Sequence, residues 1–201
     1  MNQPPVLLFD IMSTVVYDPI HKELPGFFGL TLDEFFRAAE PRSWIAFELG
    51  EIDERECMSC FFRDRRTFDV DAFKGMLFET YRFVDEGMEP LLADLNRRGF
   101  AIHALSNYPP WYRLIEDKLS LSRYLSWSFV SCEIGVRKPD PTIYEAACSQ
   151  LSVSPESAIF VDDRETNCRA ARAVGLHAVQ FSSSDKLRLE LEALITSKFN
   201  P

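Results

Sequence analysis

Apolar residues along the chain fall into short continuous runs that alternate with longer stretches of helical spacing. Val6-Leu7-Leu8-Phe9 is a run of strand length that ends at Asp10. Similar runs recur after residue 88, at 100–105, 127–131, 158–161 and 177–181. Between them, the sequence predicts helices over 89–98, 111–119, from 140 onward and 164–174. Continuous apolar strands that alternate with helices predict a parallel sheet covered by helices on both faces.

The helix ends carry ordinary stop and start signals. Gly99 and Gly175 follow the last periodic residues of two predicted helices, and glycine is the usual residue at that position. Asp140 followed by Pro141 predicts an N-cap with proline at the first helical position.

Residues 17–87 break this alternation. Thr31 with Glu34 forms a capping box before Phe35-Phe36, and further helices are predicted to open at Ser43, Asp53 and Asp69. The stretch reads as four short helices inserted between the first and second strands, with hinges at 17–19 and 85–87. We therefore predict the α/β class: a doubly wound parallel sheet in residues 1–16 and 88–201, with residues 17–87 as an inserted helical cap.

Composition and charge narrow the possible functions. The 201 residues are 46% hydrophobic with a net charge of -9, which argues against non-specific nucleic-acid binding. No apolar run approaches the roughly 20 residues that span a bilayer, so no membrane partner is expected. The first strand follows so closely on Met1 that we expect no signal or transit peptide in this sequence. Five scattered cysteines suggest a reducing compartment, and Cys57-Met58-Ser59-Cys60 at helical spacing favours packing over a zinc or redox site.

Four polar stretches follow predicted strands, at the edge where open α/β sheets bind ligands. They are Asp10, Ser106-Asn107, Arg137-Lys138-Pro139 after "SFVSCEIG", and Asp162-Asp163. Asp10 could attack phosphorus as a covalent nucleophile, and Asp10 with Asp163 could hold Mg²⁺. Ser106 and Lys138 could bind the transferring phosphoryl oxygens. Each stretch alone is more often a turn, a loop or a helix cap, but all four in order at strand ends form a coherent catalytic set.

These motifs, "LLFDIMST", "HALSN", "GVRKPDPTIY" and "IFVDDRETN", resemble the haloacid dehalogenase (HAD) superfamily over essentially the whole chain. The resemblance implies a Rossmann-like core with a cap in the position called C1, and Mg²⁺-dependent hydrolysis of a small phosphorylated metabolite through an aspartyl phosphate on Asp10. The stretches "PGFFGL", "WIAFELGEID", "SNYPPWY", "YLSWSFVSC" and "VRKPDP" look most like a narrower group, the plant and cyanobacterial HAD proteins that include chloroplast FMN hydrolase. A location in the cytoplasm or plastid stroma is implied in turn.

Met12 departs from the phosphatase pattern of the superfamily, which places an acid–base aspartate two residues after the nucleophile. The superfamily also uses the backbone carbonyl of that residue as a metal ligand, which Met12 can still supply beside Asp10, Asp162 and Asp163. General acid–base help is typically worth about 10²–10⁴-fold in rate. That help must come from a cap residue, from the substrate, from water, or not at all, and His21 near the first hinge is one candidate.

Other branches of the superfamily also lack the second aspartate. Dehalogenases place tyrosine there and need no metal, whereas Asp162-Asp163 is intact here. Phosphonatases need a cap lysine for a Schiff base, and nothing marks Lys22 or Lys74 for that role. A phosphatase is therefore favoured. The alternative is a catalytically weak protein that binds a phosphate ligand or a partner, and the sequence leaves the oligomeric state open.

Substrate contacts are expected from the cap and from the loop after the second strand. Asn107, Tyr108 and Trp111 lie in that loop, and Trp44 lies in the cap. The plainer interpretation of Trp44, as of Phe27, Phe28 and Phe47, is packing within the cap.

Overall fold

Residues 4–199 are described in the computed structural model, and their five strands form one sheet. The strands are β1 (Val6–Phe9), β2 (Ile102–Ser106), β3 (Ser126–Val130), β4 (Ala158–Asp162) and β5 (His177–Gln180). Their order is β3-β2-β1-β4-β5, and every neighbouring pair is parallel. The first strand therefore lies at the centre, and the predicted α/β class with a parallel sheet is confirmed.

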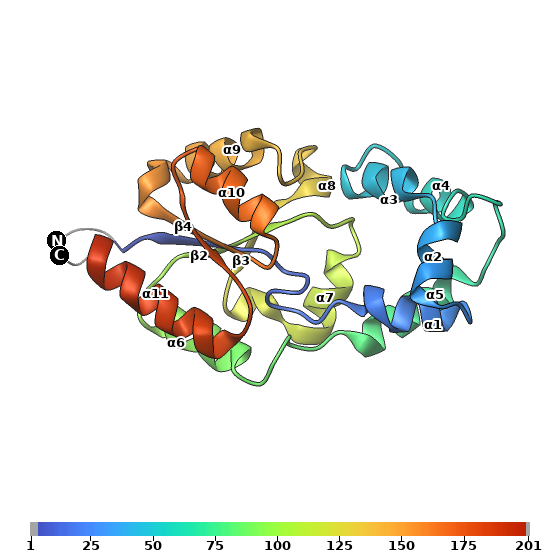
Figure 1. Cartoon of the computed structure of the whole chain (residues 1–201), viewed down its shortest axis with the longest axis horizontal. Helices are drawn as coiled ribbons and strands as arrows, with labels where there is room; N and C mark the ends of the chain where they lie inside the picture. The colour runs from blue at the N-terminus through green and yellow to red at the C-terminus, as the bar shows by residue number, and fades with distance from the viewer. Residues whose placement is uncertain (1–3, 200–201) are drawn as a thin grey trace.

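Helices cover both faces of the sheet, as Figure 1 shows. Leu8 points to the face covered by α9 (Pro141–Leu151) and α10 (Glu165–Ala173). Leu7 and Phe9 point to the other face, covered by α6 (Met88–Arg97), α7 (Tyr112–Leu119) and α11 (Ser184–Lys198). Both sides of β1 are thus buried, which explains why its sequence is a continuous apolar run instead of an alternating one.

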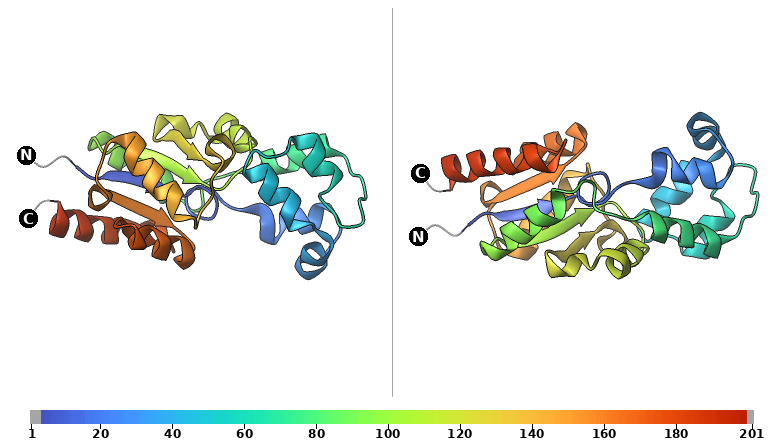
Figure 2. Two further views of the ribbon diagram at one scale, coloured as in Figure 1. Left: turned by 90° about the horizontal axis from the view of Figure 1, so that it is seen from above. Right: turned by 90° about the horizontal axis from the view of Figure 1, so that it is seen from below.

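Five further helices lie together beyond one end of the sheet (Figures 1 and 2). They are α1 (Glu23–Phe27), α2 (Leu32–Ala38), α3 (Pro41–Glu48), α4 (Glu54–Ser59) and α5 (Val70–Thr80), and we call them the cap. Phe28 sits at the centre of its core. The rings of six other phenylalanines lie between 4.8 and 6.1 Å away: Phe27, Phe35, Phe61, Phe62, Phe68 and Phe73. These phenylalanines hold the cap together, so Phe27 and Phe28 serve packing.

Two linkers join the cap to the sheet, and they run side by side. The Tyr17 N–H donates to the Arg82 carbonyl at 3.0 Å, and the Val84 N–H donates to the Val15 carbonyl at 2.9 Å. The paired linkers enter and leave the cap close to the predicted hinges. That residues 17–87 form a domain separate from residues 1–16 and 88–201 stays a prediction.

Several element boundaries differ from those predicted. Helix α3 begins at Pro41, because the Glu40 side chain accepts from the Arg42 N–H and caps the helix three residues before Ser43, the predicted opening residue. Helix α1 was not predicted, since Pro25 and Gly26 lie inside it. The strand predicted over 127–131 begins at Ser126 and ends at Val130, where the short helix α8 (Ser131–Ile134) takes over.

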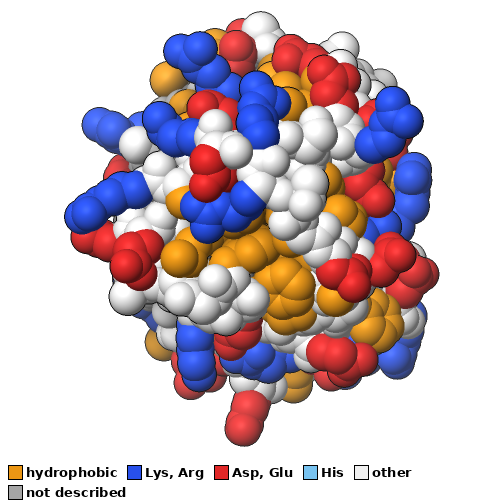
Figure 3. All heavy atoms as spheres, turned by 90° about the vertical axis from the view of Figure 1, so that its right-hand side faces the viewer, with side chains coloured by type: hydrophobic (Ala, Val, Ile, Leu, Met, Phe, Trp, Pro, Cys, Tyr) orange, Lys and Arg blue, Asp and Glu red, His pale blue; other side chains and the backbone are white. Residues whose placement is uncertain are grey.

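The end of the molecule that carries the cap exposes apolar side chains among charged ones (Figure 3). Phe36 on α2 contributes there, with 49% of its surface exposed. Within residues 4–199, no helix has both the length and the apolar character needed to cross a membrane.

Candidate active site

The polar side chains predicted to act together meet at the carboxyl end of the sheet. Asp10 follows β1, Ser106 ends β2, and Asp162 ends β4. The chain passes from one side of β1 to the other between β3 and β4, so this edge is the switch point where α/β sheets bind ligands. The Asp10 N–H donates to the Val161 carbonyl at 2.8 Å, which fixes Asp10 against β4.

Lys138 links two of these carboxylates. Its Nζ lies 2.7 Å from Oδ1 of Asp10 and 2.8 Å from Oδ2 of Asp162, and all three side chains are buried. Burial opposes the charged form of Lys138, but the attraction of both carboxylates outweighs it and raises the pKa of Lys138. Asn107 holds the backbone beneath this side chain: its Nδ2 donates to the Lys138 carbonyl and its Oδ1 accepts from the Lys138 N–H, at 2.9 and 2.7 Å.

Asp162 and Asp163 are adjacent but differ in their surroundings. Besides Lys138, Asp162 accepts from Nδ2 of Asn167 at 3.0 Å and from the Arg164 N–H at 2.8 Å. The carboxylate of Asp163 is half-buried, lines the cavity and makes no hydrogen bond to another residue in the described part of the chain. Asp162 is therefore committed to positioning its neighbours, whereas Asp163 is free to bind a ligand.

This group of residues fits a divalent cation. Carboxylate oxygens of Asp10, Asp162 and Asp163 lie within 4.8 Å of one another. Three carboxylates against the single ammonium of Lys138 leave two negative charges, which one Mg²⁺ would balance. Burial, opposed by Lys138 and reinforced by the two other carboxylates, raises the pKa of Asp10 to about 7. Among residues 4–199, no hydrogen bond reaches the Met12 carbonyl, so it is also available as a ligand.

Ser106 is completely buried at the end of β2. Its Oγ has no hydrogen-bond partner among the described residues. An unpaired buried hydroxyl costs about 1–3 kcal/mol, and a bound phosphoryl oxygen could satisfy it.

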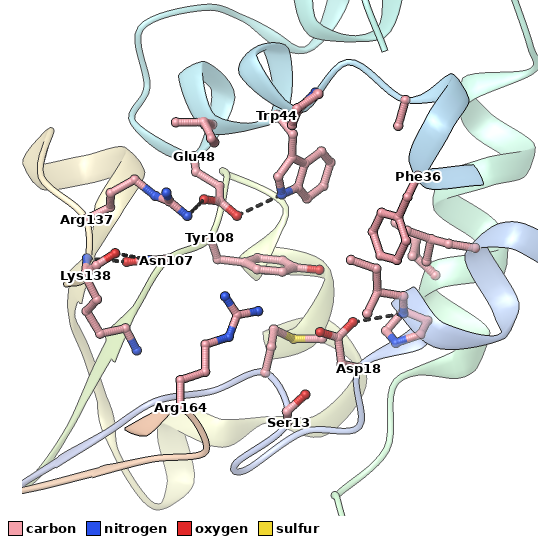
Figure 4. Close-up of a pocket in the computed structure, with 18 of the residues that line it drawn as sticks. Ser13, Asp18, Phe36, Trp44, Glu48, Asn107, Tyr108, Arg137, Lys138 and Arg164 are labelled. Carbon is pink, nitrogen blue, oxygen red and sulfur yellow. Dashed lines mark hydrogen bonds and ion pairs between the residues drawn. The ribbon is translucent and has the colours of Figure 1, made fainter. Parts of the chain in front are cut away.

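A cavity of about 260 Å³ opens between the sheet edge and the cap (Figure 4). Asp10, Lys138 and Asp163 line its floor. The remaining lining is mostly aromatic and aliphatic: Phe35, Phe36, Trp44, Phe61, Phe73 and Tyr108. The cavity thus combines a charged end with an apolar body.

An ion pair closes one side of this cavity by joining the cap to the sheet. Oε2 of Glu48, at the end of α3, lies 2.9 Å from Nη2 of Arg137. Oε1 of Glu48 accepts from Nε1 of Trp44 at 2.8 Å, and the Ser131 hydroxyl donates to the Glu48 carbonyl. Burial raises the pKa of Glu48, although Arg137 opposes the shift. Glu48 therefore links Trp44, which lines the cavity, to Arg137 on the core side.

The predicted substrate contacts divide into two groups. Trp44, Asn107 and Tyr108 line the cavity. Trp111 does not: it is buried beneath the cap, 5.5 Å from the ring of Phe47, and its Nε1 donates to Glu54. Trp111 was expected at the substrate because it follows the second strand, but the turn at Pro109-Pro110 leads its side chain into the interface between α7 and the cap.

His21 is exposed and lies outside the cavity lining, so the structure does not support it as the replacement acid. Several lining residues were not predicted to take part, and Asp18 and Arg164 are among them. Asp18 was predicted only as part of the hinge at 17–19. Figure 4 shows the Arg164 guanidinium directed into the space that Asp18 and Tyr108 also border.

Comparison with known proteins places this geometry in context. The family of haloacid dehalogenase-like hydrolases matches residues 6–175. The chain is 45% identical over 190 residues to flavin mononucleotide hydrolase 1, chloroplastic, of Arabidopsis thaliana, which covers 94% of this chain and 77% of the relative. It is 32% identical over 160 residues to a sesquiterpene phosphatase of Aspergillus oryzae, covering 76% and 79%.

A solved structure shares the fold. A HAD family enzyme of Bacteroides thetaiotaomicron, in complex with magnesium and inorganic phosphate, superimposes with a TM-score of 0.70 at 18% identity, over 90% of this chain and 95% of that one.

Proposed function

The chain belongs to the family of haloacid dehalogenase-like hydrolases, and from this premise we propose that it is a Mg²⁺-dependent phosphatase that converts FMN to riboflavin and inorganic phosphate. The observation that carries the proposal is the buried Lys138, placed between Asp10 and Asp162 at the floor of a largely apolar cavity. The name of the Arabidopsis relative supports FMN as the substrate.

In the proposed reaction, a carboxylate oxygen of Asp10 attacks phosphorus and the bond to the leaving alcohol breaks. This gives an aspartyl phosphate and riboflavin. Water then attacks the same phosphorus, which releases phosphate and restores the carboxylate. Lys138 and Ser106 stabilise the charge on the transferring phosphoryl oxygens, and Lys138 also keeps Asp10 oriented for attack.

Asp10, Asp163 and the Met12 carbonyl would hold Mg²⁺, while Asp162 keeps Lys138 and Asn167 in place. When bound, the metal ion offsets the repulsion between the carboxylate of Asp10 and the phosphate dianion.

The body of the cavity would receive the flavin. Trp44 and Tyr108 offer ring faces, and Phe36 lies at the exposed side. The cap would then act as a lid over the leaving group. A small phosphorylated metabolite is the expected partner, and the net charge of -9 does not favour nucleic acid. The chloroplastic Arabidopsis relative supports a plastid location for the reaction.

The test is a phosphatase assay over a panel of metabolites that includes FMN. Riboflavin is quantified by fluorescence after chromatography, and phosphate is measured separately. We expect Mg²⁺-dependent release of both products from FMN at equal rates, with no turnover in EDTA. Asp10→Asn is the matched negative control, since the amide keeps the volume of Asp10 but is neither a nucleophile nor an anionic ligand.

Two results would contradict the proposal in different ways. Hydrolysis of other phosphates with FMN untouched would reject the substrate and keep the reaction. Binding of phosphate without release from any compound on the panel, including an aryl phosphate, would favour the catalytically weak alternative.

A further inference from the structure

We propose that Asp18 is the acid–base residue of this site and performs the proton transfers that Met12 cannot. This inference rests on the phosphatase function proposed above, and it adds to that function a residue that lies outside the four strand-end motifs.

The position of Asp18 places it in the wall of the cavity that also holds the reacting groups. It lies in the linker from β1 to the cap and lines the same cavity as Asp10. Its Oδ1 accepts from the Ile20 N–H at 3.0 Å and caps the short helix η1 (Pro19–His21), which fixes the side chain. Figure 4 shows the carboxylate turned into the cavity, toward the space that Tyr108 and Arg164 also face. The second oxygen, Oδ2, has no hydrogen-bond partner among residues 4–199.

The surroundings of Asp18 suit a proton donor. Burial raises the pKa of its carboxyl, whereas the Ile20 N–H and the positive charges of His21 and Arg164 lower it by less. The hydroxyls of Tyr81 and Tyr108, 2.7 Å apart, also face it; burial is the main cause that raises the pKa of both phenols, and the negative charge of Asp18 adds to the shift. Asp18 therefore holds a proton at a higher pH than an ordinary aspartate does.

The other carboxylates that line the cavity are already committed. Asp10 pairs with Lys138, and Glu48 pairs with Arg137. Glu40, like Asp18, caps a helix through one oxygen, but it does so within the cap at the start of α3, whereas Asp18 lies in the linker that follows β1. Asp163 belongs to the group that would hold the metal ion. Asp18 is the remaining one, and no ion pair engages it in the described part of the chain.

The proton balance of the two steps is complete. In the first step, Asp10 attacks phosphorus, the phosphorus–oxygen bond to the leaving group breaks, and protonated Asp18 gives its proton to the leaving oxygen. In the second step, the Asp18 carboxylate takes a proton from water as that water attacks the phosphorus of the aspartyl phosphate. The bond to Asp10 breaks, phosphate leaves, and Asp18 is again protonated.

The test compares kcat/KM for a series of aryl and alkyl phosphates whose leaving groups differ in pKa. Because kcat/KM reports the steps through leaving-group departure, it isolates the first proton transfer. We expect a shallow dependence in the wild type and a steep one in Asp18→Asn. The variant should lose about 10²–10⁴-fold on alkyl phosphates and less than about 10-fold on p-nitrophenyl phosphate. The amide can still accept from the Ile20 N–H, so the cap of η1 is kept, and activity on p-nitrophenyl phosphate reports a folded protein.

His21→Asn is the matched control, because His21 shares the turn but is exposed, and its dependence should equal that of the wild type. A steep dependence in the wild type, or equal slopes in the wild type and Asp18→Asn, would overturn the role of Asp18 and leave the phosphatase function standing. A wild type that hydrolyses no phosphate in the series would overturn the phosphatase function itself.

Discussion

Nζ of Lys138 lies 2.7 Å from Oδ1 of Asp10, and at most about a tenth of either side chain is exposed. Such a pair is not a strong source of stability, because removing both charges from water costs about as much as their attraction returns. The pair instead orients the reacting group, because Lys138 holds the Asp10 carboxylate in place at the carboxyl end of β1. Lys138 supplies one positive charge against the three carboxylates of Asp10, Asp162 and Asp163, so a net negative charge remains at the site. This net charge leads to the first prediction.

Mg²⁺ should stabilise the protein more at pH 8 than at pH 6. The pKa of Asp10 is about 7 in the metal-free folded protein and about 4 when the chain is unfolded. Its contribution to stability is therefore full below about pH 4 and is lost as the pH rises through about 7. A divalent cation needs the carboxylate ionised, so it reverses this loss at high pH.

Differential scanning fluorimetry with and without Mg²⁺ measures the effect as a shift in Tm. Asp10→Asn is the control, and its Mg²⁺ shift should not change between the two pH values. A wild-type shift that is equal at both pH values, or larger at pH 6, would contradict the assignment.

Asp162 and Asp163 should respond differently to the same substitution. Asp163→Asn should raise the Mg²⁺ concentration for half-maximal activity by at least about 10-fold, with little change in Tm. Asp162→Asn should lower the free energy of unfolding by about 3 kcal/mol, because Asp162 is fully buried and holds Lys138 and Asn167. Magnesium titrations of activity and urea denaturation distinguish the two. If Asp162→Asn mainly weakened metal binding and Asp163→Asn mainly unfolded the protein, the roles would be reversed.

Trp44 and Trp111 should separate substrate binding from packing. Trp44 lines the cavity, so Trp44→Ala should raise KM for FMN several-fold and leave KM for a small aryl phosphate nearly unchanged. Trp111 is 4% exposed and lies outside the lining, so Trp111→Ala should cost about 3–5 kcal/mol of stability. Steady-state kinetics on both substrates and denaturant titrations test the pair. If Trp44→Ala raised KM equally for both substrates, Trp44 would have only a packing role, like Trp111.

Gly50 should be needed for the contact between the cap and the sheet. A Cβ at Gly50 would lie 2.5 Å from the Cys132 carbonyl oxygen, and the backbone φ is +70°. Gly29 in the cap has a similar φ of +66°, but nothing lies within 4 Å of the added atom. Gly29→Ala should therefore cost about 1 kcal/mol from backbone strain alone, and Gly50→Ala about 1–3 kcal/mol more. Equal costs in urea denaturation would mean that the cap does not press on α8 at this point.

Much of the fold could be predicted from the sequence because its signals are local. The apolar run before Asp10 and the capping box of Thr31 and Glu34 depend on neighbouring residues, and both appear as expected. Helix α1 escaped prediction because tertiary packing of Leu24 outweighs the poor helix propensity of Pro25 and Gly26.

Only part of the candidate site could be predicted from the sequence. Topology alone brings Asp10 and Asp162 together, because they lie at the ends of the neighbouring strands β1 and β4, and Lys138, in the loop after α8, could be added from its motif. The contribution of Asp18 could not, because it depends on how the linker turns into the cavity. Trp111 was misplaced for the same reason, since position after a strand does not determine where a side chain points.

The most direct test of the proposed mechanism is to locate the phosphoryl group during turnover. The enzyme is mixed with FMN and Mg²⁺, quenched in acid within the first turnovers, digested, and its peptides are analysed by mass spectrometry. The mechanism predicts one phosphoryl group on the peptide that contains Asp10, and none on that peptide in Asp10→Asn. Rapid release of riboflavin with the peptide of Asp10 never modified, or with the phosphoryl group on another residue, would contradict Asp10 as the nucleophile.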